Sequence, residues 1–544
     1  MSEITVVTER EEFVEVAASA PDGARIPVEV RTVVSDPFEA YRRVCGSDTD
    51  GVYLETTGGQ SGWGYFAIDP VERVEIPADS EEASADSGEA HGATPTLDAI
   101  DSLLDRELLV RGSCEVPYPC GAFGWLAYDV ARELETLPET TESDGLPRLQ
   151  LGVFDRVVAW KEPRDDAEGV ELRITVCPVV CDDHEASCGD DQEHTGDTET
   201  TSDHEATYET ALERATALAE AVHSEPEATP TPPVHAGSAT FESECGEAAF
   251  ADRVSAIKQY IRDGDTFQTN VSHRLVAPAA VHPVDAFDAL RRVNPAPYSG
   301  LLEFPGVDLV SASPELLLEV DGDRLITEPI AGTRPRGETP EEDAELEADL
   351  LANEKERAEH AMLVDLERND LGKVSEYGTV EVSEYRRIDR YSEVMHLVSL
   401  VEGVRRPETT IADAVAAVFP GGTITGAPKP RTMEIIDEVE RTRRGPYTGS
   451  IGIFGFDDRA TLNIVIRTLV RRGGDYRLRV GAGIVHDSVP EDEYQETLDK
   501  ARALINAVDE ALGAQASFAV EGTDRAQSNN ESDDPRPLGV DESR

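Results

Sequence analysis

Two glutamates on one face of an expected helix are the first candidates for chemistry. In "NEKERAEHAMLVDLERND", Glu356 and Glu359 stand at helical spacing from Met362, Leu363 and Leu366, so both carboxylates would point towards an apolar core. A buried carboxylate is costly unless a cation or a proton neutralises it. The pattern therefore predicts either a metal site or a buried salt bridge with an arginine.

A second pair, Glu493 and Glu496, follows Pro490 at the start of another expected helix. Both side chains point away from the apolar stripe of that helix, and the helix dipole favours acids in a first turn. Periodicity alone predicts that they face solvent, unless a site is built at the helix start.

Arg467 lies within "TLNIVIRTLV", which the apolar pattern predicts to be one strand buried on both faces. A guanidinium there needs a carboxylate partner, from the protein or from a substrate. Glycines in the expected strands "VGAGIV" (480–485) and "PIAGTRPRG" (329–337) would let a ligand approach the backbone closely. Together these residues indicate a site for a small organic acid with two carboxylates.

The stretch "GGTITGAPK" (421–429) has the composition of a phosphate-binding loop but not its spacing. A P-loop places its lysine directly after the second glycine, and a Ser or Thr after the lysine. Here Ala427 and Pro428 separate Gly426 from Lys429, and a proline follows the lysine. The spacing excludes a nucleotide site at this loop.

The charge of the chain limits its partners. The 544 residues carry a formal net charge of −61, from 110 acidic and 49 basic residues. Such a charge repels nucleic acids and anionic membranes, so we expect neither as a partner. The sequence has no apolar run near the ~20 residues that span a membrane and no signal-peptide pattern. We expect a cytoplasmic protein from a high-salt organism; the alternative from another class is a non-catalytic acidic binding protein.

The seven cysteines form no framework of the kind that small secreted domains use. The tightest group is Cys177, Cys181, His184 and Cys188, whose spacing matches no familiar zinc site. Free thiols in a reducing cytosol are therefore favoured over a zinc site.

Composition divides the chain into expected regions. We predict an N-terminal region at 1–180 that contains an acidic insertion at 76–98, and a second acidic insertion with a proline-rich linker at 181–245. A larger domain follows at 246–508, and the tail at 514–544 is expected to be disordered.

Hairpins with separate helices indicate an α+β fold. We expect an antiparallel meander over 301–330 and a hairpin over 461–485 that turns at Gly473-Gly474. Helical patterns occupy 249–263, 341–368, 430–441 and 491–513.

Many of these stretches occur in one known family. The larger domain resembles the chorismate-binding enzymes, and specifically the anthranilate synthase component I family. The matching stretches include "DTFQTNVSHR", "SASPELLLEV", "PIAGTRPRG", "ERAEHAMLVDLERNDLGKV", "FPGGTITGAPKPRTMEII", "PYTGSIGIFGF", "NIVIRTLV" and "GAGIVHDSVPEDEYQETLDKA". Together they cover nearly all of 246–508, and the N-terminal region matches more loosely through "YLETTGGQSGWGYFAI" and "GAFGWLAYDVARELETLP".

The resemblance implies a fold and a reaction. The fold would be antiparallel sheets packed as a sandwich with surrounding helices. The reaction would convert chorismate and ammonia to anthranilate and pyruvate, the first committed step of tryptophan biosynthesis. The ammonia would come from glutamine through a separate amidotransferase subunit in a heterotetramer, because this sequence shows no glutaminase triad.

The resemblance also implies roles for individual residues. Glu359 and Glu496 would hold Mg²⁺, with Glu356 and Glu493 in or near its shell. His396 would be the acid–base residue that helps the ring hydroxyl leave, and Thr425 is a weaker candidate in the same region. The remaining substrate contacts would come from Gly332, Thr333, Tyr447, Arg467 and the Gly481, Ala482 and Gly483 backbone.

Two positions favour anthranilate formation over related reactions. Family members that use water place a lysine base where this chain has Gln268, and many aminodeoxychorismate synthases place a lysine where it has Ala331. Both absences favour direct attack by ammonia. Aminodeoxychorismate synthase component I is the alternative.

The N-terminal region would then be regulatory, with tryptophan as a feedback inhibitor. The family's inhibitor segments correspond here to Thr56 in "YLET" and to Pro297, Tyr298 and Ser299 in "PYS". Thr56 keeps the family's hydroxyl group, whereas Ser299 replaces a large apolar residue. Ordinary strand packing is the alternative role for both segments.

Overall fold

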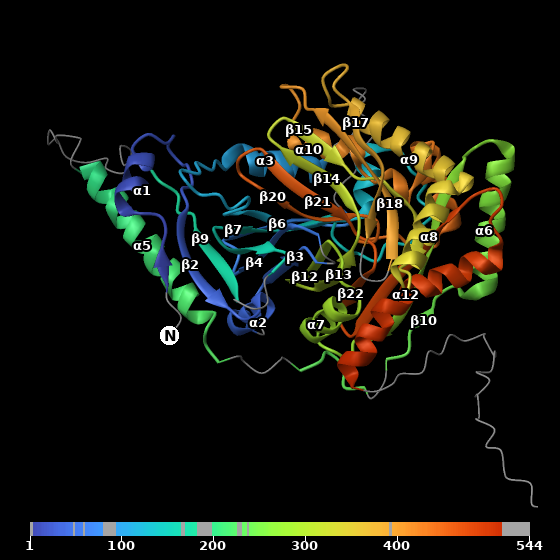
Figure 1. Ribbon diagram of the computed structural model, residues 1–544, viewed down its shortest axis with the longest axis horizontal. Helices are drawn as coiled ribbons and strands as arrows, with labels where there is room; N and C mark the ends of the chain where they lie inside the picture. Colours follow the sequence, from blue (N-terminus) through green and yellow to red (C-terminus); the bar gives the residue numbers. More distant parts are fainter. Residues whose placement is uncertain are drawn as a thin grey trace, which may run out of the picture.

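The computed structural model describes residues 4–46, 49–57, 60–79, 94–164, 169–181, 199–225, 231–236, 239–390 and 394–513. Two antiparallel sheets pack against each other with helices outside them (Figure 1). The predicted α+β class is confirmed. No helix in these ranges is both long and apolar enough to cross a membrane.

The first sheet has 13 strands within the described residues. In spatial order they are β1 (Thr5–Val6), β2 (Val28–Val34), β9 (Val170–Val176), β8 (Arg156–Glu162), β4 (Gly62–Ile68), β3 (Gly51–Glu55), β12 (Tyr298–Phe304), β13 (Val307–Ser313), β22 (Thr468–Arg472), β23 (Asp475–Ile484), β11 (Gln268–Pro278) and β10 (Glu242–Ser243), with β19 (Gly426–Ala427) paired to β11.

The second sheet has ten strands in the same ranges. Their order is β16 (Ile330–Pro335), β18 (Val394–Val404), β15 (Arg324–Thr327), β14 (Leu316–Asp321), β21 (Arg459–Ile464), β20 (Ser450–Phe454), β6 (Gly121–Leu126), β7 (Leu149–Phe154) and β5 (Glu72–Ile76), with β17 (Glu381–Arg390) paired to β18.

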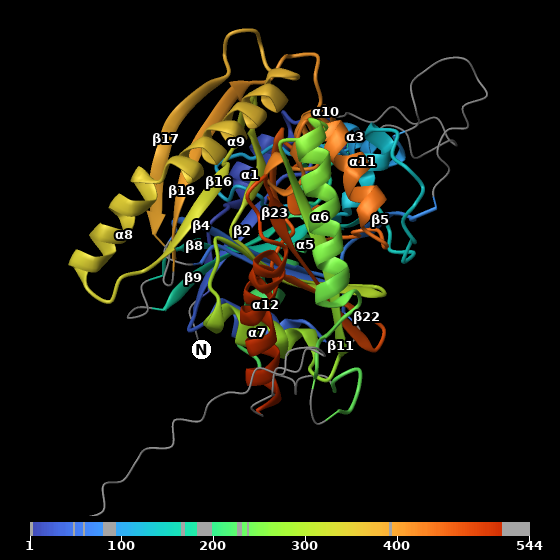
Figure 2. The same ribbon diagram turned by 90° about the vertical axis from the view of Figure 1, so that its right-hand side faces the viewer.

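Helices cover the outer faces of both sheets. They are α1 (Arg10–Ala17), α2 (Pro37–Val44), α3 (Pro95–Arg106), α4 (Ala131–Leu134), α5 (Glu199–Ala221), α6 (Gly246–Asp263), α7 (Pro283–Val293), α8 (Pro340–Ala352), α9 (Glu354–Gly372), α10 (Ile411–Val418), α11 (Lys429–Val439) and α12 (Pro490–Leu512), with short 3₁₀ turns η1 (Tyr128–Val130) and η2 (Gly422–Ile424). Helices α5, α6, α7 and α12 pack on the first sheet, whereas α3, α9 and α10 pack on the second. Figure 2 shows α9 running along β17 and β18.

A separate apolar core lies between the sheets. It joins residues of the first sheet, such as Tyr65 and Leu309, to residues of the second, such as Phe123, Trp125 and Ile453. Because alternate residues of a strand face opposite sides, each sheet can contribute to this inner core and to a helix-covered core at once.

Both halves of the chain build both sheets. Strand β3 of the N-terminal half pairs with β12, and β6 pairs with β20. Residues 199–221, within the segment expected to be insertion and linker, form α5, which covers β2 and β9. The expected insertion at 76–98 lies outside the described residues at 80–93, and so do 182–198, 226–230, 237–238 and the tail 514–544.

The helical segment expected over 341–368 is two helices. Helix α8 ends at Ala352, and the Asn353 side chain accepts a hydrogen bond from the Glu356 backbone N–H at 3.1 Å, which caps α9. An amide side chain at this position satisfies a backbone N–H that the helix itself leaves without a partner. The break gives α9 its own first turn, where Glu356 lies.

In both regions expected to form antiparallel hairpins, 301–330 and 461–485, the chain passes from one sheet to the other. The turn at Gly473-Gly474 joins β22 to β23 as expected. The chain changes sheet, however, between β21 and β22, and again between β13 and β14. The prediction of a single meander over 301–330 is therefore wrong, because its strands belong to different sheets.

Candidate functional site

The two crossings between sheets lie side by side. The Ile464 N–H donates to the Glu315 carbonyl at 3.0 Å, and the Ala312 N–H donates to the Arg467 carbonyl at 3.2 Å. Ser313 Oγ also donates to the Ile464 carbonyl at 2.5 Å. These bonds fix the connections where both sheets meet, and the candidate site is built on them.

Arg467 is not inside a strand, which corrects the expectation from its apolar neighbours. Strand β21 ends at Ile464, β22 begins at Thr468, and Arg467 has a φ of 51°. A non-glycine residue in this left-handed region is uncommon and costs about 1 kcal/mol or more. The crossing therefore holds the arginine in a strained conformation that a continuous strand would not give.

The charge of Arg467 acts on two buried groups, Glu315 and His396. Burial raises the pKa of the Glu315 carboxyl, and Arg467 and Lys500 oppose this rise. Thr423 Oγ1 donates to Glu315 Oε2 at 3.2 Å. Neither Glu315 nor Lys500 was among the predicted site residues. The one available signal for Glu315 was an acid placed between a proline and the apolar run of "SPELLLEV".

His396 lies on β18, near one edge of the second sheet, between Thr333 of β16 and Asp389 of β17. Its Nδ1 is 3.1 Å from Thr333 Oγ1 and 3.4 Å from the Gly332 carbonyl oxygen. Because a carbonyl can only accept, this arrangement requires a proton on Nδ1. Burial, and then the charge of Arg467, lowers the pKa of His396 to about 4. The structure thus brings the predicted residues Gly332, Thr333, His396 and Arg467 into one group.

The expected glycines of β23 face the first strand of the larger domain. Ser272 and Asn270 of β11 pair with Gly481 and Gly483. A Cβ on Gly481 would lie 2.7 Å from Tyr447 Oη, and one on Gly483 would lie 2.8 Å from Gln268 Nε2. Any side chain at these two positions would displace polar groups that line the site, which explains why glycine is needed.

Ala482 and Tyr447 differ in what they can present to a ligand. Ala482 is fully buried among apolar residues, so its side chain points away from the site and its backbone alone can face a ligand. Burial raises the pKa of Tyr447 to about 12, so its hydroxyl stays protonated and can donate.

The predicted metal-binding glutamates come from α9 and α12 and approach the same strand pair. Gln268 Nε2 donates to Glu359 Oε1 at 2.9 Å. Lys500 Nζ lies 2.8 Å from Glu496 Oε1 and donates to the Gly481 carbonyl at 3.1 Å. Glu359 is therefore anchored to β11 and Glu496 to β23, which are neighbouring strands.

The two remaining glutamates are only partly exposed. Glu356 forms an ion pair with Arg334 at 2.7 Å, which is the salt bridge that periodicity allowed. Its second oxygen, Oε2, is buried without a hydrogen-bond partner among the described residues, and it lies beside Gly332. Burial raises the pKa of Glu493, as does its neighbour Glu496, while a hydrogen bond from Ser488 opposes the rise. Periodicity predicted that Glu493 and Glu496 both face solvent, but Glu493 is partly buried.

These carboxylates suit a magnesium ion better than an ion that needs a protein cage. Within the described ranges no group of three or more His, Cys, Asp or Glu side chains is placed to enclose a metal. Mg²⁺ keeps several waters and takes one or two protein carboxylates together with oxygens of a substrate. The buried Oε2 of Glu356 and the raised pKa of Glu493 show negative charge that a cation would stabilise.

The loop "GGTITGAPK" is a structural support for β11. Lys429 is buried in an ion pair with Asp370 and donates to the Val418 carbonyl at 2.9 Å, so it reaches no ligand. Thr425 Oγ1 donates to the Gly421 carbonyl at 2.9 Å, and the Asn270 N–H donates to the Thr425 carbonyl at 2.8 Å. The threonine thus ties the loop to the strand that carries Gln268.

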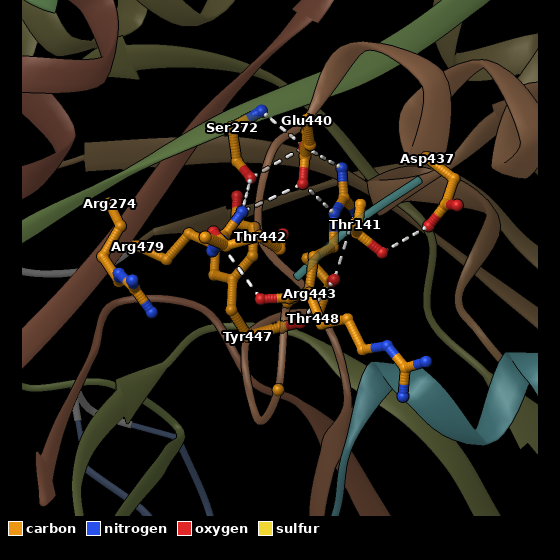
Figure 3. A network of polar contacts seen from close by, with 12 residues as sticks. Thr141, Ser272, Arg274, Asp437, Glu440, Thr442, Arg443, Tyr447, Thr448 and Arg479 are labelled. Atoms are coloured by element: carbon orange, nitrogen blue, oxygen red, sulfur yellow. Dashed lines mark hydrogen bonds and ion pairs between the residues drawn. The ribbon is translucent and has the colours of Figure 1, made fainter. Parts of the chain in front are cut away.

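A buried ionic network lies behind Tyr447 (Figure 3). Glu440 accepts from Arg444 at 2.8 Å, from Arg479 at 2.9 Å and from Ser272 Oγ at 2.8 Å. Burial opposes the charge of Glu440, but the two arginines hold its pKa below the usual value. The network fixes the end of α11 to β11 and β23.

The four predicted inhibitor residues lie elsewhere, in a cavity of about 590 Å³ between the sheets. Thr56 and residues 297–299 line one part of it, and Trp63, Tyr118 and Ile453 add apolar surface. The described lining includes none of the predicted metal or substrate residues. The resemblance thus implied two groups of residues, and the structure places these groups apart from each other.

Only part of the cysteine cluster can be located. Cys177 is buried and Cys181 is exposed, and both are free thiols. His184 and Cys188 lie outside the described residues.

Similarity to known proteins extends over both halves of the chain. Residues 53–506 match the family described as chorismate binding enzyme. The chain is 69% identical over 526 residues to anthranilate synthase component 1 3 of Haloarcula marismortui, covering 96% of this chain and 98% of that protein. Anthranilate synthase component 1 1 of the same organism is 64% identical over 518 residues, covering 95% and 99%. The crystal structure of anthranilate synthase component I from Streptococcus pneumoniae TIGR4 is similar with a TM-score of 0.65 and 29% identity, covering 86% of this chain and 97% of that one.

Proposed function

The chain belongs to the family of chorismate binding enzymes, and we propose that it is the first component of an anthranilate synthase. It would convert chorismate and ammonia to anthranilate and pyruvate, which is a lyase reaction. The observation that carries the proposal is that Arg467, at the crossing of the two sheets, acts on His396 and, together with Lys500, on Glu315, while Lys500 joins Glu496 to Gly481 and Gln268 holds Glu359.

The substrate fits this arrangement because chorismate is a dianion without phosphate. Arg467 offers a guanidinium for the enolpyruvyl carboxylate, and the protonated Tyr447 hydroxyl can donate to the same group. The glycines allow that end of the substrate to lie against the backbone of β23. Gly332 and Thr333 would contact the substrate beside His396.

The second carboxylate would face a magnesium ion held by Glu359 and Glu496, with Glu356 and Glu493 supporting them. When bound, the ion supplies a positive charge that orients the ring carboxylate and stabilises the negative charge of the reacting ring. Gln268 positions Glu359, and Lys500 positions Glu496. The carboxylates stay ionised more easily once a cation is shared between them.

His396 would donate a proton to the hydroxyl that leaves the ring while ammonia attacks. With its lowered pKa, the free protein holds a neutral imidazole at neutral pH, protonated on Nδ1. The two carboxylates of a bound substrate would favour a second proton on the imidazole of His396, because opposite charge nearby stabilises the charged form. Thr333 and Gly332 hold the ring in place by bonding Nδ1.

Ammonia would reach this site from a glutamine amidotransferase subunit, and we propose a heterotetramer of two copies of each component. The word "component" in the names of the relatives fits such an arrangement. We place the protein in the cytoplasm of a salt-loving organism, a setting that fits its net charge of −61 and its similarity to proteins of Haloarcula marismortui.

The cavity between the sheets would bind tryptophan as a feedback inhibitor. Its volume of about 590 Å³ exceeds that of the amino acid, and its lining combines aromatic rings with polar groups. We expect one tryptophan to bind per chain, and titration calorimetry of the purified protein checks this. Thr56→Leu would fill part of the cavity and weaken binding at least tenfold, whereas an unchanged affinity would place the inhibitor elsewhere.

One assay tests the proposed reaction. The purified chain in multimolar KCl is incubated with chorismate, ammonium and Mg²⁺, and the products are identified by fluorescence and mass. Anthranilate and pyruvate, both lost with EDTA and restored by Mg²⁺, are expected. Aminodeoxychorismate without pyruvate would assign the protein to the alternative reaction, and no turnover by a folded sample would favour an acidic binding protein.

A further inference from the structure

The cavity between the sheets reaches towards the candidate active site. Its lining includes Tyr298, which is one of the predicted inhibitor residues, and three charged residues of the second sheet region, Glu328, Arg387 and Asp389. The last two belong to β17, the neighbour of the strand that carries His396. The cavity wall and the catalytic strand are therefore adjacent.

The charged residues form a chain of contacts. Tyr298 Oη lies 3.5 Å from Glu328 Oε2, and Arg387 Nη2 donates to Glu328 Oε1 at 3.1 Å. Arg387 also binds Asp389 through two bonds of 2.6 and 2.8 Å. Arg387 forms a third ion pair, with Glu384 of the same strand. A guanidinium that serves several carboxylates at once can shift among them when one gains another partner.

Asp389 is the member of the chain that faces His396. The two residues are directly opposite each other on β17 and β18, so their side chains share one face with Cβ atoms about 5 Å apart. Asp389 raises the pKa of His396 against burial and Arg467, which lower it. From α9, Glu356 lies next to Gly332, whose carbonyl His396 contacts, and it is paired with Arg334.

We propose that Glu328, Arg387 and Asp389 form a relay that couples the occupant of the cavity to His396, with Arg387 as its switching group. The relay rests on the proposed function, in which the occupant is tryptophan. An amino acid brings an ammonium group and a carboxylate, which complement Glu328 and Arg387. When the ligand pairs with either of them, the two bonds from Arg387 to Asp389 weaken, and Asp389 no longer supports a charged His396.

The chain offers a matched control for Arg387. Arg459 lines the same cavity but lies on β21, where it pairs with Asp321 at 3.1 Å. Replacing either arginine by Gln removes one positive charge from the cavity wall. Only the replacement of Arg387 removes the bonds to Asp389.

The experiment measures coupling by calorimetry. The Kd of tryptophan is determined with and without saturating chorismate and Mg²⁺, in the absence of ammonium, so that no turnover occurs. We expect chorismate to weaken tryptophan binding about tenfold in the natural protein, a common size for coupling between two sites. Arg387→Gln should weaken tryptophan binding without chorismate, because Arg387 complements the carboxylate of the ligand, and should reduce this ratio to about two or less, whereas Arg459→Gln should keep the ratio.

A second pair of variants separates the relay from loss of folding. Arg387→Lys keeps the charge but cannot make two parallel bonds to Asp389, so the ratio should fall without loss of stability. Asp389→Asn should lower the ratio as much as Arg387→Gln, and the double variant should lower it no further. Thermal unfolding confirms that each variant is folded.

The possible failures are distinguishable. If the natural protein neither turns over chorismate nor binds tryptophan, both the proposed function and the relay are overturned. If it does both, and Arg387→Gln and Arg387→Lys keep the full ratio, the relay alone is wrong. If Arg387→Gln and Arg459→Gln lower the ratio of the two Kd values equally, the coupling is a general effect of cavity charge, and the relay is overturned as well.

Discussion

Glu359→Gln is expected to reduce chorismate turnover about a thousandfold, equivalent to about 4 kcal/mol of transition-state stabilisation. Gln keeps the shape of the side chain and can still accept the bond from Gln268, which is 2.9 Å long in the natural protein. It lacks the negative charge needed to hold a divalent cation beside the ring carboxylate. The expected loss is thus a loss of metal binding and not of local structure.

Glu354→Gln is the control for this prediction. Glu354 is exposed on the first turn of the same helix α9, and the same change of charge there should alter turnover by less than about twofold. Activity is measured over a range of Mg²⁺ concentrations, and Mg²⁺ binding is measured by calorimetry with chorismate present. Turnover above a tenth of the natural value in Glu359→Gln would show that this carboxylate does not hold the metal.

Glu440→Gln is expected to lower the free energy of unfolding by about 3–5 kcal/mol. The natural carboxylate satisfies two buried arginines, Arg444 at 2.8 Å and Arg479 at 2.9 Å, in a network with Ser272 (Figure 3). An amide can still accept a bond from Ser272, but it leaves two positive charges in the protein interior without a negative one. Because the network fixes β11 and β23 behind Tyr447, activity should fall as well.

A surface glutamate on α11, the helix that ends just before Glu440, provides the comparison. Glu434 pairs with Arg431 at 2.7 Å in a partly exposed position, and such pairs contribute about 0–1 kcal/mol. Urea unfolding of both variants at one fixed KCl concentration gives the two differences. A cost below about 1 kcal/mol for Glu440→Gln would mean that solvent, and not Glu440, stabilises the arginines.

Motifs could predict which residues belong to the candidate site, but they could not predict how these residues are arranged in space. Arg467 shows the limit most clearly. A run of apolar residues is the same for one buried strand as for two strands in different sheets, so "TLNIVIRTLV" indicated a single strand. The crossing depends on a left-handed φ of 51° at an arginine, where no glycine marks the turn.

Missed residues have a similar explanation. Lys500 follows Glu496 by four positions, which on a surface helix is the usual spacing of an ordinary ion pair. Its bond to the Gly481 carbonyl shows that it belongs to the site, and this bond depends on α12 packing against β23. Glu315 likewise becomes a site residue only because two crossings lie side by side.

The sequence by itself determined the α+β class, the two glutamate pairs, the glycines of β23 and the resemblance that connects them to a dianionic substrate. These depend on local spacing and side-chain chemistry, which the order of residues contains. Only the tertiary structure decided that both halves of the chain share each sheet, that the residues predicted to bind an inhibitor line a separate cavity, and that β17 both lines this cavity and pairs with the strand of His396. The shared sheets arise from pairing between strands hundreds of positions apart, such as β3 with β12 and β6 with β20, and no local pattern specifies which strands will meet.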